Sequence, residues 1–423
     1  MDKKLLLSAF LATILIYALV LASTLCFRTV QAATDVSGII TSDTTWTKAN
    51  SPYSLTGPTA VGEGVTLTIE AGATVNLNDY YIEVNGTLRA IGSSTDKIRI
   101  NGITGDPPMK GVLVPFTYGI RFTTVSDGYN QQTGSGCIIE NAIIASTTIS
   151  ARGSKISNNV INGFIGAGGS SIISNNAITG KVSSTDTAMV SGNTITGEIE
   201  LRWDSPSISD NIITGHGGTG ISVESTDNAL ISNNTISGCD TGVYLGGLVT
   251  IEKNLIINND NGISIYSGVY YGGSATIREN TISKNYIGIK YIVDVNCSIS
   301  YNNFQNNSYS LYSDISEDID AVNNWWGTTD TQVIKQSIYD AEDDFNLGTV
   351  NFTPFLTEPN PDSPQTPTST PSPSPAQTTP PEQTPTPTQA PQQTEFTTII
   401  GAAIVVTVLS AGLGLLIYLI KRK

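Results

Sequence analysis

The sequence predicts an all-β fold, a right-handed, single-stranded parallel β-helix in which short strands stack coil upon coil. The first observation is a repeated pattern, an aliphatic residue followed three positions later by asparagine, which recurs between residues 138 and 324. The second is the composition: 13% charged residues and 40 glycines suit strands and tight turns better than amphipathic helices. Hydrophobic residues, at 39% of the chain, supply a continuous core.

The asparagines of this pattern follow one another at intervals of 17 to 26 residues, close to the length of one β-helix coil. We expect each copy to form a strand, a bend at the asparagine and a second strand, because asparagine tolerates the left-handed backbone conformation. Its amide can also bond to the asparagine of the next coil, which predicts a structural ladder. The members of the predicted ladder are Asn141, Asn159, Asn176, Asn193, Asn211, Asn234, Asn254, Asn280, Asn302 and Asn324.

Short strands opened by glycine join the pattern in the later coils, with the sequences GISV, GVYL, GISI and GIKY from residue 220 onward. They alternate in polarity, as half-buried strands do. Each strand would pair with its counterpart in a neighbouring coil about 4.8 Å away, so a coil can bury its inner face only by stacking.

The ends of a β-helix need cover, because an open terminal coil exposes strand edges and core. We expect a lead-in and cap over residues 33–64, with Trp46 as a plug, then the β-helix over 65–320 and a C-terminal cap over 321–357. In that cap, Thr329 and Gln332 have the spacing of a capping box for a short helix.

The N-terminal residues predict export. Lys3 and Lys4 precede an uncharged stretch from Leu5 to Phe27, and small residues follow where a signal peptidase cleaves. Residues 1–32 are therefore predicted to be a signal peptide, with an uncleaved anchor as the alternative, because the apolar stretch is long enough to span a bilayer.

The C-terminal residues predict a tether. Residues 358–394 are rich in proline and threonine and predict an extended stalk. Residues 397–420 carry no charge and end at the basic residues 421–423, which predicts a transmembrane helix with a cytoplasmic tail. We expect a protein of the cell membrane with one C-terminal span and its ectodomain at the cell surface.

The charge and the cysteines exclude some functions. There are 36 acidic and 21 basic residues, and a net charge of -15 argues against nucleic acid as a partner. Outside the leader, Cys137, Cys239 and Cys297 form an odd set without CxxC spacing, which we interpret as small core residues. A disulfide between Cys239 and Cys297 is the alternative.

The Gly-Ile-x-Ile and Ile-x-x-Asn-x-Ile patterns resemble the repeats of NosD-like periplasmic proteins and of the wider pectin-lyase-like class of carbohydrate-binding and sugar-hydrolase β-helices. The segments LTIEAGATVNL at 67–77 and NNWWGTTD at 323–330 look like those of archaeal and bacterial surface β-helix proteins. The resemblance covers about Val65 to Leu356 and implies the fold. It leaves adhesion, polysaccharide chemistry and copper delivery open as functions.

The sharpest candidate for hydrolysis is His216, the single histidine, in the tripeptide Gly215-His216-Gly217. The resemblance places this tripeptide in polygalacturonase sites. Inverting hydrolysis also needs carboxylates on both sides of the bond, and the Asn-Thr-Asp, Asp-Asp and Arg-x-Lys motifs of those enzymes have no counterpart at the matching positions. We therefore interpret His216 as a turn residue.

A lyase would need carboxylates that bind Ca²⁺ beside a base. The candidates for a structural Ca²⁺ site are Asp314, Glu317, Asp318 and Asp320, which lie near the C-terminal end of the repeats. The mid-helix bases, Lys181 and Arg202 among them, have no evident carboxylate trio beside them, and this argues against a lyase. Copper delivery would need more histidine, cysteine and methionine than the chain has, so no cofactor is expected.

Aromatic residues gather in the later coils, where rings spaced by coils could stack on sugar faces. The predicted ligand-binding residues are Trp203, Tyr244, Tyr266, Tyr270, Tyr271 and Tyr291. Tyrosines packed into the strand surface are the alternative. The first functional hypothesis is a non-catalytic surface protein for adhesion, envelope structure or polysaccharide binding. A polysaccharide lyase or glycoside hydrolase is the second hypothesis, and NosD-like copper delivery is the third.

Overall fold

A computed structural model describes residues 32–102, 119–215, 217–266, 275–294 and 297–366. The predicted signal peptide, the larger part of the stalk, the transmembrane segment and His216 lie outside these residues. Within the described ranges, no helix is both long and apolar enough to cross a membrane.

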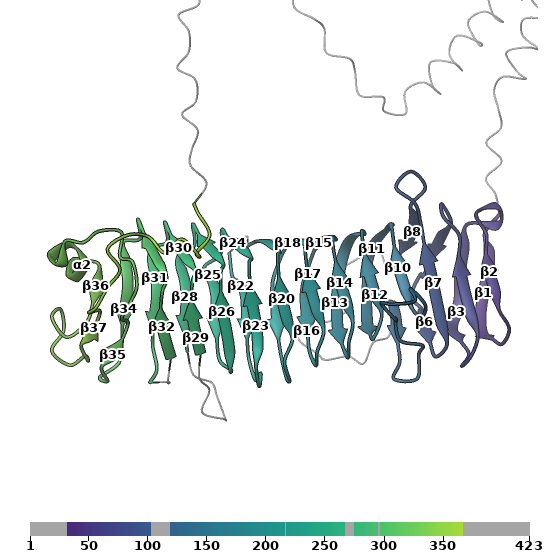
Figure 1. The fold of residues 1–423 in the computed structure, drawn as a ribbon. Helices are drawn as coiled ribbons and strands as arrows, with labels where there is room; N and C mark the ends of the chain where they lie inside the picture. Colours follow the sequence, from purple (N-terminus) through teal and green to yellow (C-terminus); the bar gives the residue numbers. More distant parts are fainter. Residues whose placement is uncertain (1–31, 103–118, 216, 267–274, 295–296, 367–423) are drawn as a thin grey trace, which may run out of the picture. The chain divides into compact units, whose positions relative to one another are not determined.

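The described chain is a parallel β-helix with three rows of stacked strands (Figure 1). The first row is a sheet of 12 strands, joined in this order. Its members are β2 (Thr44–Trp46), β4 (Thr66–Ile69), β7 (Thr87–Ile91), β10 (Ile138–Glu140), β12 (Lys155–Ser157), β14 (Ile172–Ser174), β17 (Met189–Ser191), β20 (Ser207–Ser209), β23 (Ala229–Ser232), β26 (Val249–Glu252), β29 (Ala275–Arg278) and β32 (Cys297–Ser300).

The second and third rows form one 23-stranded sheet, because four long strands run through both rows: β1 (Thr34–Ile40), β3 (Tyr53–Val61), β11 (Ala142–Arg152) and β13 (Val160–Gly168). The second row also contains β5 (Thr74–Asn76), β8 (Ile98–Asn101), β15 (Ala177–Thr179), β18 (Thr194–Thr196), β21 (Ile212–Thr214), β24 (Thr235–Ser237), β27 (Leu255–Ile257), β30 (Thr281–Ser283) and β33 (Asn303–Gln305). The third row also contains β6 (Tyr81–Val84), β9 (Gly119–Phe122), β16 (Val182–Ser184), β19 (Ile199–Leu201), β22 (Thr219–Val223), β25 (Thr241–Leu245), β28 (Asn261–Ile265), β31 (Ile287–Tyr291), β34 (Tyr309–Ser313) and β36 (Ile338–Tyr339).

The core is a set of aliphatic stacks, one for each row. In the first row, parallel pairing places the buried Ile208, Ile231, Ile251, Ile277 and Ile299 directly on one another. The other two rows contribute equivalent stacks, which end at Phe304 in the second row and at Ile338, on Leu311, in the third. The all-β, parallel β-helix prediction is therefore confirmed.

The asparagine ladder is present, and its geometry differs from the expected one in one respect. The left-handed residue of each bend is the one before the ladder asparagine, for example Asn233 with φ 56° before Asn234. Asn234 itself is buried and donates from its backbone N–H and its Nδ2 to Asn254 Oδ1, at 2.9 and 3.0 Å. Its Nδ2 also donates to Ile208 O at 2.9 Å. The bend and the ladder thus use two neighbouring residues.

Asn141 was wrongly assigned to the ladder. Strand pairing aligns Ile139 with Ile156, one residue later than the sequence pattern suggested. Ala142 consequently takes the ladder position and donates its backbone N–H to Asn159 Oδ1 at 2.8 Å. Asn141, with φ 53°, is the bend residue of that coil. The nine members from Asn159 to Asn324 form the continuous ladder.

A second asparagine ladder follows the second row. Asn259 donates its backbone N–H to Asn285 Oδ1 at 2.9 Å, and Asn285 does the same to Asn307. Cys239 precedes them at the equivalent position and donates its N–H to Asn259 Oδ1 at 3.0 Å. The strand-opening glycines face this ladder: a Cβ on Gly242 would lie 3.2 Å from Asn259 Nδ2 and 2.6 Å from a backbone carbonyl. Glycine is therefore required there by close backbone approach.

The ends of the stack differ from the expected caps. β1 and β2 already pair with β3 and β4, so the stacked strands begin at Thr34, within the predicted lead-in. Trp46 is buried there and stacks on Tyr53 at 4.9 Å between ring centroids. At the other end, Trp326 stacks on Phe304 at 4.8 Å.

The short helix α2 (Thr331–Gln336) follows in the C-terminal cap, and β35 (Ile319–Asp320) pairs with β37 (Val350–Asn351). The predicted capping box was wrong, because Asp330 caps α2 and accepts a hydrogen bond from Gln332 N at 2.9 Å. Near the N-terminal end of the stack, η1 (Lys48–Asn50) is a single 3₁₀ turn.

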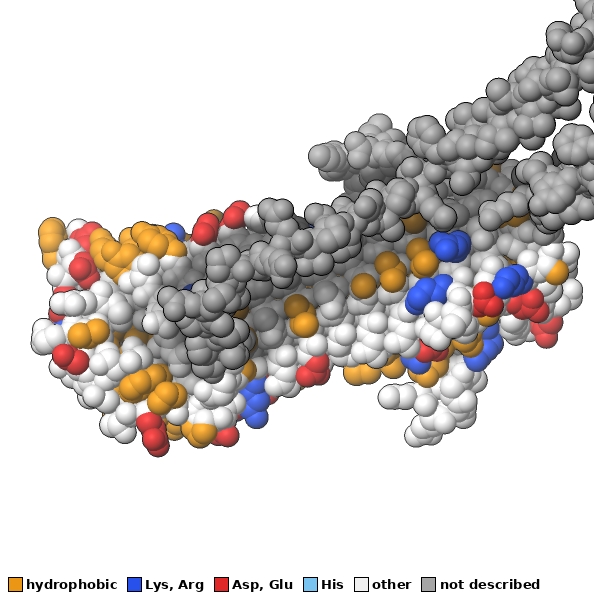
Figure 2. All heavy atoms as spheres, turned by 90° about the horizontal axis from the view of Figure 1, so that it is seen from above, with side chains coloured by type: hydrophobic (Ala, Val, Ile, Leu, Met, Phe, Trp, Pro, Cys, Tyr) orange, Lys and Arg blue, Asp and Glu red, His pale blue; other side chains and the backbone are white. Residues whose placement is uncertain are grey.

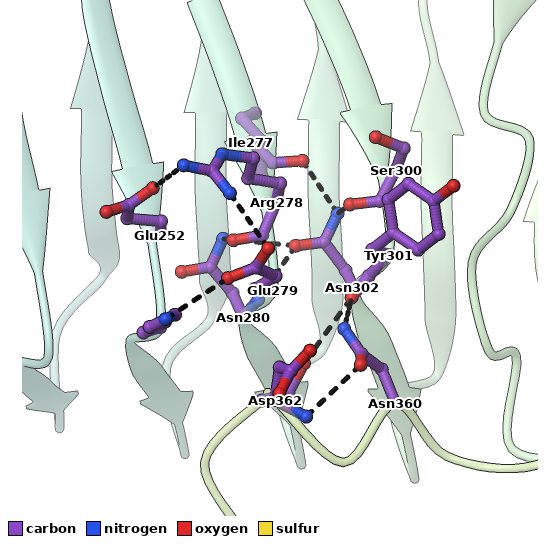
Figure 3. A network of polar contacts seen from close by, with 12 residues as sticks. Glu252, Ile277, Arg278, Glu279, Asn280, Ser300, Tyr301, Asn302, Asn360 and Asp362 are labelled. Atoms are coloured by element: carbon purple, nitrogen blue, oxygen red, sulfur yellow. Dashed lines mark hydrogen bonds and ion pairs between the residues drawn. The ribbon is translucent and has the colours of Figure 1, made fainter.

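The first residues of the predicted stalk pack against the β-helix. Residues 358–366, here called the C-terminal strap, lie along the outside of β33 and β30 (Figure 3). Asn360 N donates to Asn303 Oδ1 at 2.7 Å, and Asn303 Nδ2 donates back to Asn360 O at 3.1 Å. Asn360 Nδ2 also donates to Tyr301 O at 2.6 Å. Paired hydrogen bonds offset the cost of ordering this segment, which composition alone assigned to the stalk.

The adjacent pair Asn233 and Asn234 separates the two roles of asparagine. Asn234→Ala leaves several buried polar groups without partners and should lower the unfolding free energy by about 2–5 kcal/mol. Asn233→Gly keeps the left-handed bend without a Cβ, and the expected change is within about 0.5 kcal/mol of zero. Urea unfolding followed by circular dichroism measures both. Equal losses for the two variants would contradict the assignment of the ladder to Asn234.

The buried thiol of Cys137 should make stability fall at alkaline pH. Burial raises the pKa of Cys137 from 9.0 to about 11. Above about pH 9 the unfolded state loses this proton while the folded state keeps it, so up to about 2–3 kcal/mol of stability is lost by about pH 11. Cys137→Ala should remove that part of the loss. The difference in unfolding free energy between wild type and variant, measured by urea unfolding, should be smaller at about pH 11 than at about pH 8. An equal difference at the two pH values would disprove the assignment of this loss to Cys137.

Candidate functional site

The outer side of the third row carries a charged cluster and two aromatic groups, and we call it the polar face. Strand pairing aligns one outward residue from each coil along the stack, because alternate residues of a strand point to opposite sides. From β16 to β36 these are Ser183, Glu200, Ser222, Tyr244, Ser264, Lys290, Tyr312 and Tyr339. Glu200 lies on the earlier coils, and the tyrosines lie on the later ones together with Lys290.

A charged cluster occupies the polar face at β16, β19 and β22. Lys181 Nζ lies 3.2 Å from both Glu198 and Glu200, and Arg202 lies 2.8 Å from Glu200 and 3.0 Å from Glu224. Burial lowers the pKa of Lys181, but the charges and hydrogen bonds of the two glutamates outweigh burial, and the pKa lies above its usual value. Lys181 is therefore protonated at neutral pH.

The prediction that no carboxylate trio flanks Lys181 and Arg202 was wrong. Glu198 lies 17 residues after Lys181 and Glu224 lies 22 after Arg202, which are single-coil intervals. Glu200, in β19, and Arg202, directly after β19, are two residues apart and lie on the same side, where they form an ion pair. Comparing residues at coil spacing, instead of along the local sequence, would have found the cluster.

Two of the predicted aromatic residues form a pair on the next coils. Tyr244, on β25, is half-buried, and its ring centroid lies 5.5 Å from that of Tyr266, which is 44% exposed. Burial, followed by the neighbouring Tyr266 and Glu224, raises the pKa of Tyr244. Its hydroxyl is thus a hydrogen-bond donor throughout the neutral range.

A second aromatic group lies at the C-terminal end of the polar face. Tyr312 and Tyr339 stack with centroids 4.4 Å apart and planes 3° apart, and Tyr309 meets Tyr312 edge-on at 5.7 Å. Lys290 Nζ lies 5.9 Å from the Tyr312 centroid. Sequence reasoning assigned Tyr339 to the cap and Lys290 to no role, because their positions on this face depend on the pairing of β31, β34 and β36.

The other predicted ligand-binding residues do not join these groups. Tyr291 is 4% exposed and points into the core, since it aligns with Ile265 and Leu245 of the preceding coils. Its proposed contact with ligand is therefore wrong. Trp203 is 60% exposed on the turn after β19, with φ 56°. Tyr270 and Tyr271 lie outside the described residues, as does the catalytic candidate His216.

The predicted calcium ligands serve as structural acceptors in the C-terminal cap. Asp318 Oδ1 accepts from Thr349 N at 2.8 Å, and Asp320 Oδ1 accepts from Asn351 Nδ2 at 3.0 Å. Glu317 accepts from a neighbouring serine, and Asp314 is exposed. In the part of the chain that the structure describes, no group of three or more His, Cys, Asp or Glu residues is placed to hold a metal ion.

The cysteines bear on the copper-delivery hypothesis. Cys137, Cys239 and Cys297 are all free, so the alternative of a disulfide between Cys239 and Cys297 was wrong. Burial raises the pKa of Cys297 to about 12 and that of Cys239 above its usual value. Burial thus disfavours the thiolate form that binds soft metals.

The match to a protein family agrees with the strand arrangement. Residues 181–333 match the family described as a right handed beta helix region. A crystal structure of the periplasmic alginate epimerase AlgG, an aspartate-to-alanine mutant, is 15% identical over 75% of this chain and 82% of that chain, with a TM-score of 0.43. A threonine-to-asparagine mutant of AlgG covers the same shares at 14% identity and a TM-score of 0.38. No curated protein matches the sequence.

These solved structures resemble the chain only distantly, and the fold assignment rests on the family match and the strand pairing. The family match places a right-handed β-helix at 181–333, and the same three rows of strands continue on both sides of it. The described chain is therefore a right-handed parallel β-helix protein.

Proposed function

We propose that this protein is a membrane-anchored surface protein whose β-helix binds polysaccharide on the polar face without cleaving it. The leader and the C-terminal apolar segment of the sequence support export and anchoring. The tyrosines of the polar face support the choice of ligand, and they are the observation that carries the proposal.

The two aromatic groups suit a long, repetitive ligand. Tyr244 and Tyr266 lie on neighbouring coils, and Tyr312 and Tyr339 lie further along the same face. Aromatic rings offer apolar surface to the faces of sugar rings, while nearby polar groups bond to hydroxyls. Lys290 makes no ion pair among the described residues and could receive a carboxylate of an acidic sugar.

Removing one ring from each group tests the proposal. Tyr244→Ala and Tyr312→Ala should each weaken binding about tenfold, because each removes a stacking surface. Tyr301→Ala is the matched control, since Tyr301 is 47% exposed on the bend between β32 and β33, away from the polar face. Binding to a panel of neutral and acidic polysaccharides is measured by calorimetry. No binding across the panel, or an equal loss in the control, would refute the proposal.

The second candidate function is polysaccharide cleavage, which the charged cluster favours. Lys181 and Arg202 could neutralise a sugar carboxylate, and Glu198, Glu200 and Glu224 could accept a proton. The raised pKa of Lys181 makes it unsuited to act as the base itself. This arrangement fits elimination from an acidic sugar better than hydrolysis through His216.

The two functions are distinguished by turnover. If cleavage occurs at this cluster, unsaturated or reducing products form and Glu200→Gln lowers their rate at least about a hundredfold. Glu342→Gln, which removes an exposed charge beside Lys335 in the cap, should leave the rate unchanged. Absence of products with every polysaccharide that the protein binds would eliminate the cleavage hypothesis and leave the binding function.

A further inference from the structure

Five asparagines of the chain begin the three-residue motif Asn-x-Ser or Asn-x-Thr, which we call the sequon and whose asparagine amide can accept an N-linked glycan. They are Asn85, Asn233, Asn296, Asn306 and Asn351. Asn296 lies outside the described residues. The other four occupy two kinds of position in the fold, and the hydrogen bonds of their side chains distinguish the two kinds.

Asn233 and Asn306 are bend residues, and each lies directly before a ladder asparagine. Both are exposed and have left-handed backbone, with φ 56°. Among the described residues, neither side chain has a hydrogen-bond partner, and the ladder bonds are made by the next residue, Asn234 or Asn307. The amide nitrogens of Asn233 and Asn306 are therefore accessible and unengaged.

The hydroxyl residues of these two sequons lie on the outside as well. Thr235 opens β24 at an outward, half-buried position, and Ser308 is exposed just before β34. The middle residue of each sequon points inward, because it belongs to a ladder. Since the motif requires both the amide and the hydroxyl, this alternation presents the two required groups together at the surface.

Asn85 and Asn351 are held by hydrogen bonds of their side chains. Asn85 is half-buried, its Nδ2 donates to Glu83 Oε1 at 3.2 Å, and its Oδ1 accepts from Thr123 Oγ1 at 2.9 Å. Asn351 Nδ2 donates to Asp320 Oδ1 at 3.0 Å, across the pairing of β35 and β37. In the folded protein, a reaction at either amide must first break these bonds.

We propose that Asn233 and Asn306 are N-glycosylated in the folded protein and that Asn85 and Asn351 are not. The donor is an oligosaccharide linked to a lipid phosphate on the exported side of the membrane. The amide nitrogen forms a bond to C1 of the first sugar and loses one proton, while the bond from C1 to the phosphate oxygen breaks and its electron pair leaves with the phosphate. The inference rests on the export proposed above, since only an exported chain meets this donor.

The two sites lie on opposite borders of the second row. Asn233 lies between β23 of the first row and β24, and Asn306 lies between β33 and β34 of the third row. From β15 to β33, no strand of the second row contains Lys, Arg, Asp or Glu. Figure 2, the view from above, shows mostly uncharged side chains along the middle of the stack. Because glycans are bulky and strongly hydrated, glycans on the two borders would supply hydration that charged side chains supply elsewhere.

The test uses the folded full-length chain, produced in cells without N-glycosylation and purified in detergent. It is incubated with a purified single-subunit oligosaccharyltransferase and its lipid-linked oligosaccharide, and mass spectrometry of peptides follows the occupancy of each sequon. Short synthetic peptides of the four sequons give the rates without the fold. Relative to their peptides, Asn233 and Asn306 should react at least about tenfold faster than Asn85 and Asn351, whose amides must first give up a hydrogen bond.

Ala177→Thr is a matched variant that should create a new site. Asn175 is an exposed bend residue with φ 56°, and Asn176 is the ladder residue after it, so this change alone completes a sequon in the same geometry. Asn175 should then be modified at a rate similar to that of Asn233. Ala177→Val completes no sequon and should leave Asn175 unmodified. Circular dichroism confirms that each variant folds.

Thr235→Val should abolish modification at Asn233 and leave that at Asn306 unchanged. The proposal is overturned if Asn233 or Asn306 stays unmodified, if Asn85 and Asn351 react as fast relative to their peptides, or if Thr235→Val has no effect.

Export is tested separately, by labelling intact cells that make the chain with a lysine reagent that does not cross membranes. Absence of label on the β-helix would refute export, and with it the modification in the cell, while the result with the purified protein would stand. Failure at the two asparagines of the purified protein would refute the sites and leave export unaffected.

Discussion

The fold depends on hydrogen bonding between equivalent residues of successive coils. Parallel backbone pairing supplies most of these bonds, but the bends between strands would leave buried backbone groups unpaired without a side chain of suitable length. Asparagine meets this need because its Oδ1 accepts from the backbone N–H and the Nδ2 of the ladder residue in the coil before, and its own Nδ2 donates to the coil after. Each ladder residue is therefore satisfied only when its neighbours are in place. Stability is thus a property of adjacent coils and cannot be assigned to single ones.

Most of the fold could be predicted from the sequence because the ladder leaves a pattern in it. Between residues 138 and 324 the pattern gave the length of each coil and the row of aliphatic residues, but it could not fix the register by itself. At Asn141 the sequence Ile-Ile-Glu-Asn allows two alignments, and only the pairing of Ile139 with Ile156 decides between them. The second ladder has the same spacing, as in Ile282 and Asn285, and could have been found from the sequence.

The candidate site was harder to predict because its residues are neighbours across coils and far apart in sequence. Lys181, Glu198 and Glu224 come together only through the pairing of β16, β19 and β22. Tyr291 shows the opposite error: a tyrosine in a tyrosine-rich region was expected outside, while the alternation of β31 places it inside. The composition correctly pointed to the later, tyrosine-rich coils. The direction of each side chain, which composition does not give, decides which of their residues are accessible.

The C-terminal strap determines which bonds first bear a pulling force applied to the chain beyond Thr366. The chain passes the last coil, turns back and is held at Asn303 and Thr281 before it reaches Thr366. A pull on the chain beyond Thr366 would therefore act first on the few bonds of the strap, while the capped end, closed by Trp326 and Phe304, is shielded. These bonds would break one after another, as in peeling, at lower force than the many parallel bonds of a coil. Under such a pull, the strap would detach and extend before the β-helix unfolds.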